Sequence, residues 1–226
     1  MLPAADRVAA IIPAAGSGSR LGADVPKAFI ELDGLTLLAR SALAMSRVAG
    51  TIAVAAPPGY LERAARELAE LEADVHIVAG GDDRQASVAA ALAVLPETID
   101  IVLVHDAARP LVPADMVGRV LGAVAASALA AIPVLPVVDT VREVRGDVAG
   151  EVIDRGMLRR VQTPQVFDAA TMRRAYAAAT AVQTDDAALV QALGVDVVTV
   201  LGDERALKIT TPDDLTVARA YLEELR

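Results

Sequence analysis

The chain contains no cysteine and no tryptophan among its 226 residues. Without cysteine, disulfide bonds, thiolate catalysis and zinc–cysteine sites are excluded. Aromatic residues make up 2% of the chain, which is too few for a stacking platform that binds single-stranded nucleic acid. No stretch reaches the roughly 18 consecutive apolar residues that span a bilayer, and the N-terminus lacks a basic segment followed by a long apolar one.

Positive charge is also scarce, since the net charge is −9. A chain this acidic is a poor match for nucleic acid or for an anionic membrane surface. We therefore expect a cytoplasmic protein with neither partner. Among the 21 basic residues only Lys27 and Lys208 are lysine. A coding bias toward arginine explains this, but a site that needs a compact point charge, such as a phosphate clamp, would also retain lysine.

Apolar segments alternate with helix-like segments along most of the chain. This alternation predicts a single α/β domain whose mostly parallel sheet is covered by helices on both faces. The expected strands are residues 9–13, 51–55, 75–78, 101–105, 130–138, 159–166, 195–200 and 206–210. The expected helices are residues 36–48, 59–71, 84–95, 114–126, 169–179 and 185–193, with a final helix from Pro212.

One segment interrupts this alternation. Residues 137–145 and 148–153 alternate apolar and polar side chains around a Gly146-Asp147 turn, which is typical of a β-hairpin. A two-stranded ribbon is not stable by itself. We therefore expect a projecting β-arm at about residues 137–158 that packs on a second subunit, and the alternative is an arm folded back on its own domain.

The first strand runs into a loop of small residues that contains Gly16, Gly18 and Gly22, with Arg20 and Lys27 close by. Small residues let backbone N–H groups approach an anion closely, so the loop is predicted to bind phosphate. An ordinary tight turn is the alternative. The third glycine is one place late for a dinucleotide fingerprint, and no acid ends the second strand to hold a ribose, which disfavours an NAD(P) oxidoreductase. No Gly-Lys-Ser/Thr sequence follows the glycines, so the loop is not a Walker loop either. A catalytically silent nucleotide-binding protein is a further alternative.

A second glycine stretch, Gly80-Gly81-Asp82-Asp83-Arg84, follows the third strand, with Ser87 one helical turn later. Its backbone groups could bind a nucleotide base, and the Ser87 hydroxyl could hydrogen-bond to the same base. Alternatively, Asp82 or Asp83 caps the following helix. Both interpretations can hold together.

The fourth strand delivers Asp106 and Arg109 to the carboxyl edge of the sheet. Asp106 could accept a substrate hydroxyl or lie near a metal ion, and Arg109 could bind an anion. A structural Asp106–Arg109 pair is the alternative. His105 is expected to be a packed strand residue, because the only other histidine, His76, gives no metal-ligand spacing with it.

Together with the later segments Asp139-Thr140, Asp154-Arg155, Gln162 to Gln165, Thr184 to Asp186 and Lys208 to Thr210, these stretches resemble the 2-C-methyl-D-erythritol 4-phosphate cytidylyltransferase family. The resemblance covers about residues 8–222. It implies a Rossmann-like nucleotidyltransferase domain spanning residues 1–226 and a homodimer joined through the β-arm. The implied reaction joins CTP and 2-C-methyl-D-erythritol 4-phosphate, releases pyrophosphate and serves isoprenoid biosynthesis. The related ribitol-5-phosphate cytidylyltransferases share many motifs and define the alternative substrate.

The resemblance also implies a role for individual residues. The catalytic cations would be Arg20, Lys27, Arg155 and Lys208. CTP would be bound by Pro13, Ala14, Ala15, Gly16, Ser17, Gly18, Gly81, Asp82, Arg84, Ser87 and Ala107. The sugar phosphate would be bound by Asp106, Arg109, Thr140, Thr163 and Thr184. The implied cofactor is Mg²⁺, held mainly by substrate phosphates and with no protein ligands assigned.

Overall fold

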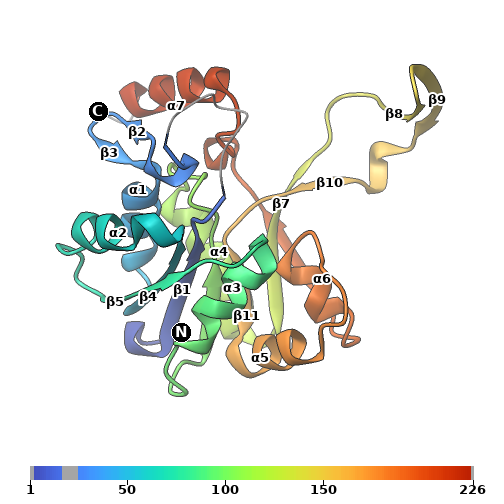
Figure 1. Cartoon of the computed structure of the whole chain (residues 1–226). Coiled ribbons are helices and arrows are strands. Elements are labelled where there is room, and N and C mark those ends of the chain that lie inside the picture. The colour runs from blue at the N-terminus through green and yellow to red at the C-terminus, as the bar shows by residue number, and fades with distance from the viewer. Residues whose placement is uncertain (1–2, 17–24, 225–226) are drawn as a thin grey trace.

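A computed structural model of the chain describes residues 3–16 and 25–224. Its centre is an eight-stranded sheet in the order β10-β7-β11-β6-β1-β4-β5, with β12 also paired to β7 (Figure 1). The strands are β1 (Val8–Pro13), β4 (Thr51–Ala56), β5 (Asp74–Ala79), β6 (Ile101–Val104), β7 (Ala130–Pro136), β10 (Arg159–Val161), β11 (Gln165–Asp168) and β12 (Val198–Leu201).

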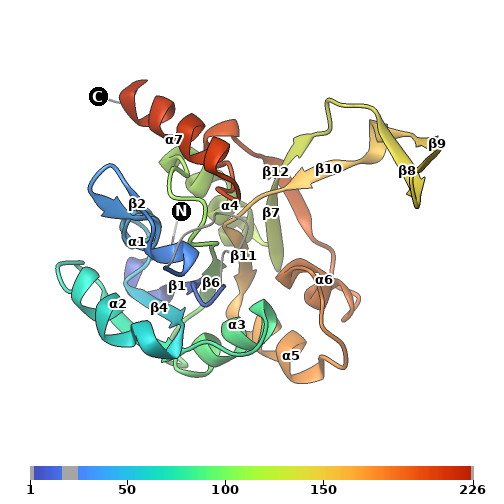
Figure 2. The same ribbon diagram turned by 45° about the horizontal axis from the view of Figure 1, so that its top comes forward.

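Helices cover both faces of this sheet, as predicted (Figure 2). One face packs against α1, α2 and α4, and the other against α3, α5 and α6. The helices are α1 (Leu37–Ser46), α2 (Leu61–Glu67), α3 (Arg84–Ala93), α4 (Ala114–Ala126), α5 (Ala169–Ala178), α6 (Asp186–Gln191) and α7 (Pro212–Glu224). Short 3₁₀ helices are η1 (Ala5–Arg7), η3 (Lys27–Phe29), η4 (Pro58–Tyr60), η5 (Arg155–Met157) and η6 (Glu204–Ala206).

The central strand β1 is buried on both faces. Its residues from Val8 to Ile12 have no exposed surface, with alternate side chains entering the two separate cores. β1 pairs in parallel with β4 and with β6, and β4 pairs in parallel with β5. The carboxyl ends of these four strands therefore meet at one edge of the sheet, which is where α/β proteins bind their ligands.

The expected strand at residues 159–166 is wrong as a single element. It forms two strands, β10 and β11, which follow one another along the same side of β7 and are both antiparallel to it, while β12 pairs with the other side of β7. Pro164 interrupts the segment, because proline has no N–H to donate to a strand ladder. The sheet is therefore mostly parallel but has antiparallel strands at this end.

Two further differences concern short elements. The expected strand at residues 206–210 is absent from the described structure, where η6 ends at Ala206 and Ile209 donates one backbone hydrogen bond to Ala108. A small hairpin of β2 (Glu31–Leu32) and β3 (Leu35–Thr36) was not expected. Its turn residues Asp33 and Gly34 both have positive φ, and Asp-Gly is a favoured pair in such turns.

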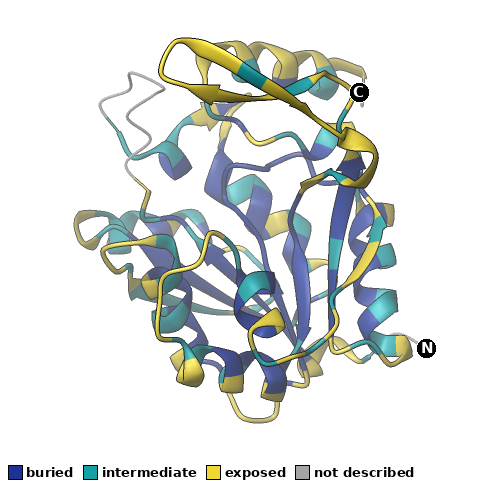
Figure 3. Cartoon of the chain, turned by 90° about the vertical axis from the view of Figure 1, so that its right-hand side faces the viewer, coloured by how far each residue is buried: buried dark blue, intermediate teal, exposed yellow. Residues whose placement is uncertain are grey.

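The hairpin of β8 (Val141–Arg145) and β9 (Val148–Ile153) forms at the predicted residues around Gly146, whose φ is +60°. It is a separate two-stranded sheet that extends away from the domain (Figures 1 and 2). Most of its side chains are exposed, in contrast to the buried central strands (Figure 3). Its packing on a second subunit stays a prediction.

A search of the described residues for a helix both long and apolar enough to cross a membrane found none.

Candidate active site

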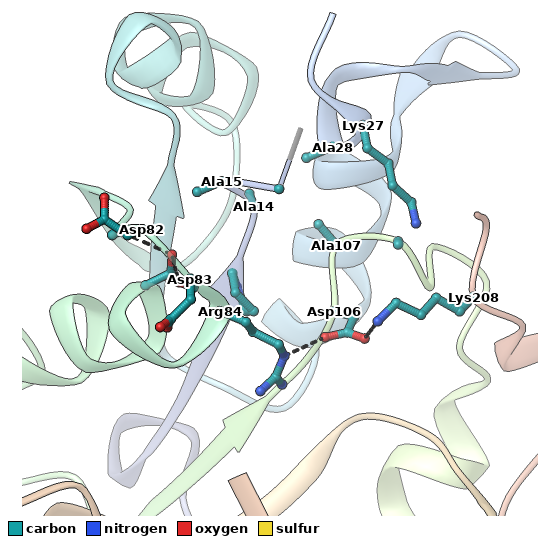
Figure 4. A pocket seen from close by; sticks show the side chains of 15 residues that line it. Ala14, Ala15, Lys27, Ala28, Asp82, Asp83, Arg84, Asp106, Ala107 and Lys208 are labelled. Atoms are coloured by element: carbon teal, nitrogen blue, oxygen red, sulfur yellow. Dashed lines mark hydrogen bonds and ion pairs between the residues drawn. The ribbon is translucent and has the colours of Figure 1, made fainter. Parts of the chain in front are cut away.

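A pocket of about 470 Å³ lies at the carboxyl edge of the parallel strands (Figure 4). Its walls come from the segments that follow β1, β5 and β6, and from two distant lysines, Lys27 and Lys208. The lining residues are Pro13, Ala14, Ala15, Gly16, Lys27, Ala28, Gly81, Asp82, Asp83, Arg84, Ser87, Asp106, Ala107, Ala108 and Lys208.

The two glycine segments touch each other, which explains why neither carries larger side chains. A Cβ atom added to Gly80 would lie 2.3 Å from the Ala15 Cβ and 3.0 Å from the Ser87 Oγ. A Cβ added to Gly81 would lie 2.5 Å from the Ala86 Cβ. The loop after β1 can therefore rest directly on the loop after β5 only because Gly80 has no side chain.

The start of α3 confirms the helix-cap alternative, while the binding of a nucleotide base stays a prediction. Asp83 is the N-cap, and its Oδ1 accepts a 2.7 Å hydrogen bond from the Ala86 N–H, while Asp82 lines the pocket. The Ser87 hydroxyl donates to the Asp83 carbonyl at 2.8 Å and accepts from the Gly81 N–H at 3.1 Å. Ser87 thus holds the glycine loop against the helix.

A row of alternating charges forms the floor of the pocket. The Lys208 Nζ lies 2.8 Å from the Asp106 Oδ2, and the Arg84 Nε donates to the Asp106 Oδ1 at 3.2 Å. The Arg84 Nη1 lies 2.7 Å from the Oδ2 of Asp186, which is 1% exposed. Although burial opposes the charged form, Lys208 and Arg84 hold the pKa of Asp106 well below its usual range. Asp106 is therefore an ionised acceptor at neutral pH.

Beneath the pocket, His105 and Thr163 lock the end of β6. The His105 Nε2 lies 3.1 Å from the Arg109 carbonyl oxygen, which can only accept, so Nε2 carries the proton. The Thr163 hydroxyl then donates to Nδ1 at 3.2 Å, while its oxygen accepts from the Asp106 N–H at 3.1 Å. His105 has no exposed surface, which confirms that it is a packed strand residue.

Arg109 is also buried, and its donors serve backbone oxygens. Nη1 donates to the Ala206 carbonyl at 2.6 Å and Nη2 to the Val161 carbonyl at 3.3 Å. Its Nε lies 3.9 Å from the Asp106 Oδ2, which makes a long ion pair. Arg109 therefore links the segment after β6 to η6 and β10, and the long ion pair with Asp106 is the structural pair that the sequence left as an alternative.

The burial of His105 predicts a specific acid sensitivity. Burial lowers the pKa of His105 from its usual 6.5 to about 4. Between those values the unfolded chain binds a proton that the folded chain does not, so acid favours unfolding. Between about pH 7 and about pH 5, protonation of this histidine in the unfolded chain should lower the free energy of unfolding by about 2 kcal/mol. Most carboxyl groups titrate below this range, so they should add little to the change.

Urea unfolding at the two pH values measures this loss. His105→Asn should be less stable at neutral pH but should show a smaller decrease on acidification. His76→Asn is the control, because His76 lies at a sheet edge beside Asp74 and its replacement should leave the decrease in place. An equal decrease in the wild type and His105→Asn would contradict the assignment.

Lys27 reaches the pocket from a firmly anchored turn. It begins η3, whose other two residues, Ala28 and Phe29, are 4% and 1% exposed. The Phe29 ring packs 4.7 Å from the Tyr60 ring and 5.2 Å from the Arg63 guanidinium carbon. These buried contacts hold the backbone that presents the Lys27 ammonium to the pocket (Figure 4).

The structure brings most of the predicted site residues together. The pocket contains twelve of them: Pro13, Ala14, Ala15, Gly16, Lys27, Gly81, Asp82, Arg84, Ser87, Asp106, Ala107 and Lys208. Thr163 and Arg109 lie buried behind its wall, and Thr140, Arg155 and Thr184 are exposed and are not among its lining residues. Ser17, Gly18 and Arg20 lie outside the described residues.

Sequence reasoning assigned no role to Asp186, which the structure places in the charge row under Arg84. It also left out Ala28 and Ala108 as pocket walls. Thr184, Asp185 and Asp186 precede a helix, so either acid could be its cap; in the structure Asp185 is the N-cap and Asp186 is buried. Only packing distinguishes the two carboxylates.

Comparisons with known proteins agree with this architecture. Residues 8–224 match the family described as IspD, 2-C-methyl-D-erythritol 4-phosphate cytidylyltransferase. The enzyme of that name from Rhodococcus jostii strain RHA1 is 48% identical over 222 residues, which cover 96% of each chain. The crystal structure of the enzyme of that name from Thermus thermophilus is 43% identical, with a TM-score of 0.80 over 96% of this chain and 99% of that one.

A more distant structure has the same fold. The 4-diphosphocytidyl-2C-methyl-D-erythritol synthase of Anaerococcus prevotii is 26% identical and superposes with a TM-score of 0.82 over 96% of this chain and 99% of that one. These matches favour methylerythritol phosphate over ribitol 5-phosphate as the sugar substrate. The chain therefore belongs to the 2-C-methyl-D-erythritol 4-phosphate cytidylyltransferase family, and its activity is the nucleotidyl transfer that defines that family.

Proposed function

We propose that the pocket joins CTP to 2-C-methyl-D-erythritol 4-phosphate and releases pyrophosphate, giving 4-diphosphocytidyl-2-C-methyl-D-erythritol for isoprenoid precursor synthesis. The observation that carries the proposal is the convergence of Lys27 and Lys208 on one pocket whose remaining walls are backbone-rich loops. Lysines are rare in this chain and these two lie near its opposite ends, yet both reach the same pocket. Two ammonium groups beside backbone N–H donors suit a reaction between two phosphorylated substrates.

CTP is proposed to lie along the two glycine segments. Pro13 to Gly16 would follow its phosphates, and Gly81 to Ser87 with Ala107 would surround the nucleoside. Lys27 would contact the triphosphate. Ser17, Gly18 and Arg20 complete the expected binding set, and their role stays a prediction because they lie outside the described residues.

The sugar phosphate is proposed to lie near Asp106 and Lys208. Asp106 is held ionised by its cations and can accept hydrogen bonds from polyol hydroxyl groups. The Lys208 ammonium can hold the phosphate. Thr184 and Thr140 are exposed and do not line the pocket in the single chain, so their contact with the sugar phosphate stays a prediction. Thr163 would act from beneath, through its hydrogen bonds to Asp106 and His105.

The substrate's own phosphate oxygen is the proposed nucleophile. It attacks the α-phosphorus of CTP, a new P–O bond forms, and the bond to the bridging oxygen breaks so that pyrophosphate leaves with the electron pair. A phosphate is already ionised near neutral pH, so no general base is required. His105 could not serve as one, since burial and its two ring contacts keep it inside the wall. Catalysis then depends on positioning and on fixed cations that stabilise the transition state.

Mg²⁺ is the proposed cofactor, and the pocket's donor set suits it. Of the pocket carboxylates, Asp83 caps α3 and Asp106 is paired with cations, so Asp82 is the side chain that could approach the ion. Mg²⁺ prefers few protein ligands together with water and phosphate oxygens. When bound, it would neutralise charge on the triphosphate.

We also propose a homodimer joined through the β8–β9 hairpin and a cytoplasmic location, where nucleoside triphosphates are made. The hairpin exposes Val144, Val148 and Val152, with Val148 at 70%, and the adjoining η5 exposes Met157 at 88%. An isolated ribbon with exposed apolar side chains needs a surface to cover it. Arg155, at the base of the hairpin, donates to the Val138 carbonyl and would reach toward the partner's pocket.

Arg155→Ala is expected to raise the KM for the sugar phosphate by about tenfold or more, because one charge-assisted contact to phosphate is lost. Direct binding of CTP should stay unchanged. Arg145→Ala is the matched control, since Arg145 is exposed on the same hairpin at its turn. Loss of CTP binding in a variant that stays dimeric by light scattering would contradict the role of Arg155.

Pyrophosphate release tests the function as a whole. The chain is incubated with CTP, Mg²⁺ and either methylerythritol phosphate or ribitol 5-phosphate. We expect rapid release with the first and at least about a hundredfold lower kcat/KM with the second, because mismatched hydroxyls leave polar groups of the pocket unpaired. Equal or greater activity with ribitol 5-phosphate would overturn the assigned substrate.

A further inference from the structure

Asp186 is a buried charge that the proposed mechanism does not use. It is the first residue of α6, and only 1% of its surface is exposed. Burying an ionised carboxylate costs several kcal/mol unless a partner compensates for the lost hydration. Among the described residues one cation balances this charge, and that cation is Arg84, a residue of the candidate site.

The contacts of Asp186 divide between its two carboxylate oxygens. Oδ1 accepts a short hydrogen bond from the Tyr176 hydroxyl of α5. Oδ2 forms an ion pair with the Arg84 Nη1 at 2.7 Å and accepts no hydrogen bond among the described residues. Tyr176 therefore fixes the orientation of the carboxylate, and the second oxygen is directed to Arg84.

Arg84 is held at two of its three nitrogens. Nη1 meets Asp186 and Nε meets Asp106, while Nη2 has no protein partner within the part of the chain that the structure describes. The two carboxylates raise the pKa of Arg84 despite its burial, so the guanidinium stays charged. A guanidinium is a rigid planar fork, so two fixed edges determine where the third nitrogen points.

We infer that Asp186, oriented by Tyr176, is a positioning residue that sets the direction of the Arg84 guanidinium for the nucleotide. The inference rests on the assignment of Arg84 to CTP under the proposed function. Without the Asp186 charge, Asp106 is the remaining anion beside Arg84, and Asp106 also holds Lys208. The guanidinium would then turn toward Asp106, away from its position for CTP.

The test is CTP binding measured by calorimetry on the full chain, for Asp186→Asn, Arg84→Ala and the double variant. Asp186→Asn keeps the shape and the acceptor for Tyr176 but removes the charge. We expect its Kd for CTP to rise about tenfold, the effect of losing one hydrogen bond to a charged group. Arg84→Ala should raise the Kd at least as much, and the double variant should match Arg84→Ala within about twofold.

Steady-state kinetics separate positioning from general damage. The KM for CTP should rise in Asp186→Asn more than kcat falls, whereas partial unfolding would lower kcat in proportion to the active fraction. Asp168→Asn is the matched control, because Asp168 is a helix N-cap on α5 that accepts from the Thr171 N–H and does not contact Arg84. It should bind CTP as the wild type does.

Tyr176→Phe covers the case in which Asp186→Asn fails to fold. It keeps the buried charge but releases the carboxylate, so CTP binding should weaken by about threefold, and the effect should vanish when Arg84 is alanine. Wild-type CTP affinity in both folded variants, or an added loss in the Arg84→Ala background, overturns the positioning role. Unchanged CTP affinity in Arg84→Ala itself would instead overturn the proposed assignment of Arg84.

Discussion

Lys27→Ala is expected to lower kcat by at least about a hundredfold, the scale of losing one preorganised group that stabilises a transition state. Negative charge accumulates on the α-phosphate and on the leaving pyrophosphate, and the ammonium in the pocket would stabilise it. The buried Ala28 and Phe29 hold the turn that carries Lys27, so the truncation removes the charge and leaves its support. Pyrophosphate release at saturating substrates measures kcat.

Two variants make this result specific. Lys27→Arg restores the charge as a planar fork and should recover only part of kcat, because a compact ammonium and a guanidinium place their donors differently. Arg47→Ala removes one positive charge from the end of α1, outside the pocket, and should leave kcat unchanged. Near wild-type turnover in Lys27→Ala would show that the ammonium is not part of the reaction.

Lys208→Ala is the second substitution with a large expected effect, a fall of about a hundredfold in kcat/KM for the sugar phosphate. The Lys208 ammonium lines the pocket with 43% of its side chain exposed, 2.8 Å from the Asp106 carboxylate. Its removal takes away the proposed contact with the substrate phosphate and one of the cations that compensate the charge of the Asp106 carboxylate. The remaining negative charge in the pocket would then repel the incoming phosphate. Initial rates at varied sugar phosphate and saturating CTP measure the effect.

The backbone around Lys208 should survive this change. Ile209 is fully buried and donates a 2.8 Å hydrogen bond to the Ala108 carbonyl, which fixes the segment independently of the lysine side chain. We therefore expect CTP binding within about threefold of the wild type and a retained thermal transition, because Arg84 still donates to the Asp106 carboxylate at 3.2 Å. A parallel loss of CTP binding, sugar phosphate use and melting temperature would indicate a structural role instead.

Much of the fold follows from local patterns. Continuous apolar runs predict β1, β4 and β6, because strands buried on both faces need apolar side chains at every position. The start of α7 at Pro212 could be predicted, because proline and acidic residues are both favoured in the first turn of a helix. The apolar pattern fails at residues 159–166, where it does not show that one strand ends at Val161 and a second begins at Gln165 beside the same strand β7.

The candidate site divides in the same way. The segments that meet in the pocket could be identified from the glycines and the aspartate that follow the strands, and from the two lysines. This worked because parallel strands bring their carboxyl ends to one edge of the sheet. Substrate binding by Arg109 and Thr163 stays a prediction, and in the single chain their polar atoms contact backbone groups and His105 behind the wall. Side-chain direction depends on the partners available at each position, which residue type alone does not specify.

The sequence by itself determined the α/β class, the position of the glycine segments, the hairpin and the family, because each depends on local spacing or on the order of motifs along one chain. The tertiary structure decided how the charges pair. Residues 84, 106, 186 and 208 are distant in sequence, yet they form one row of contacts between 2.7 and 3.2 Å. Electrostatic interaction depends on distance and burial, which exist only after the strands and helices have packed.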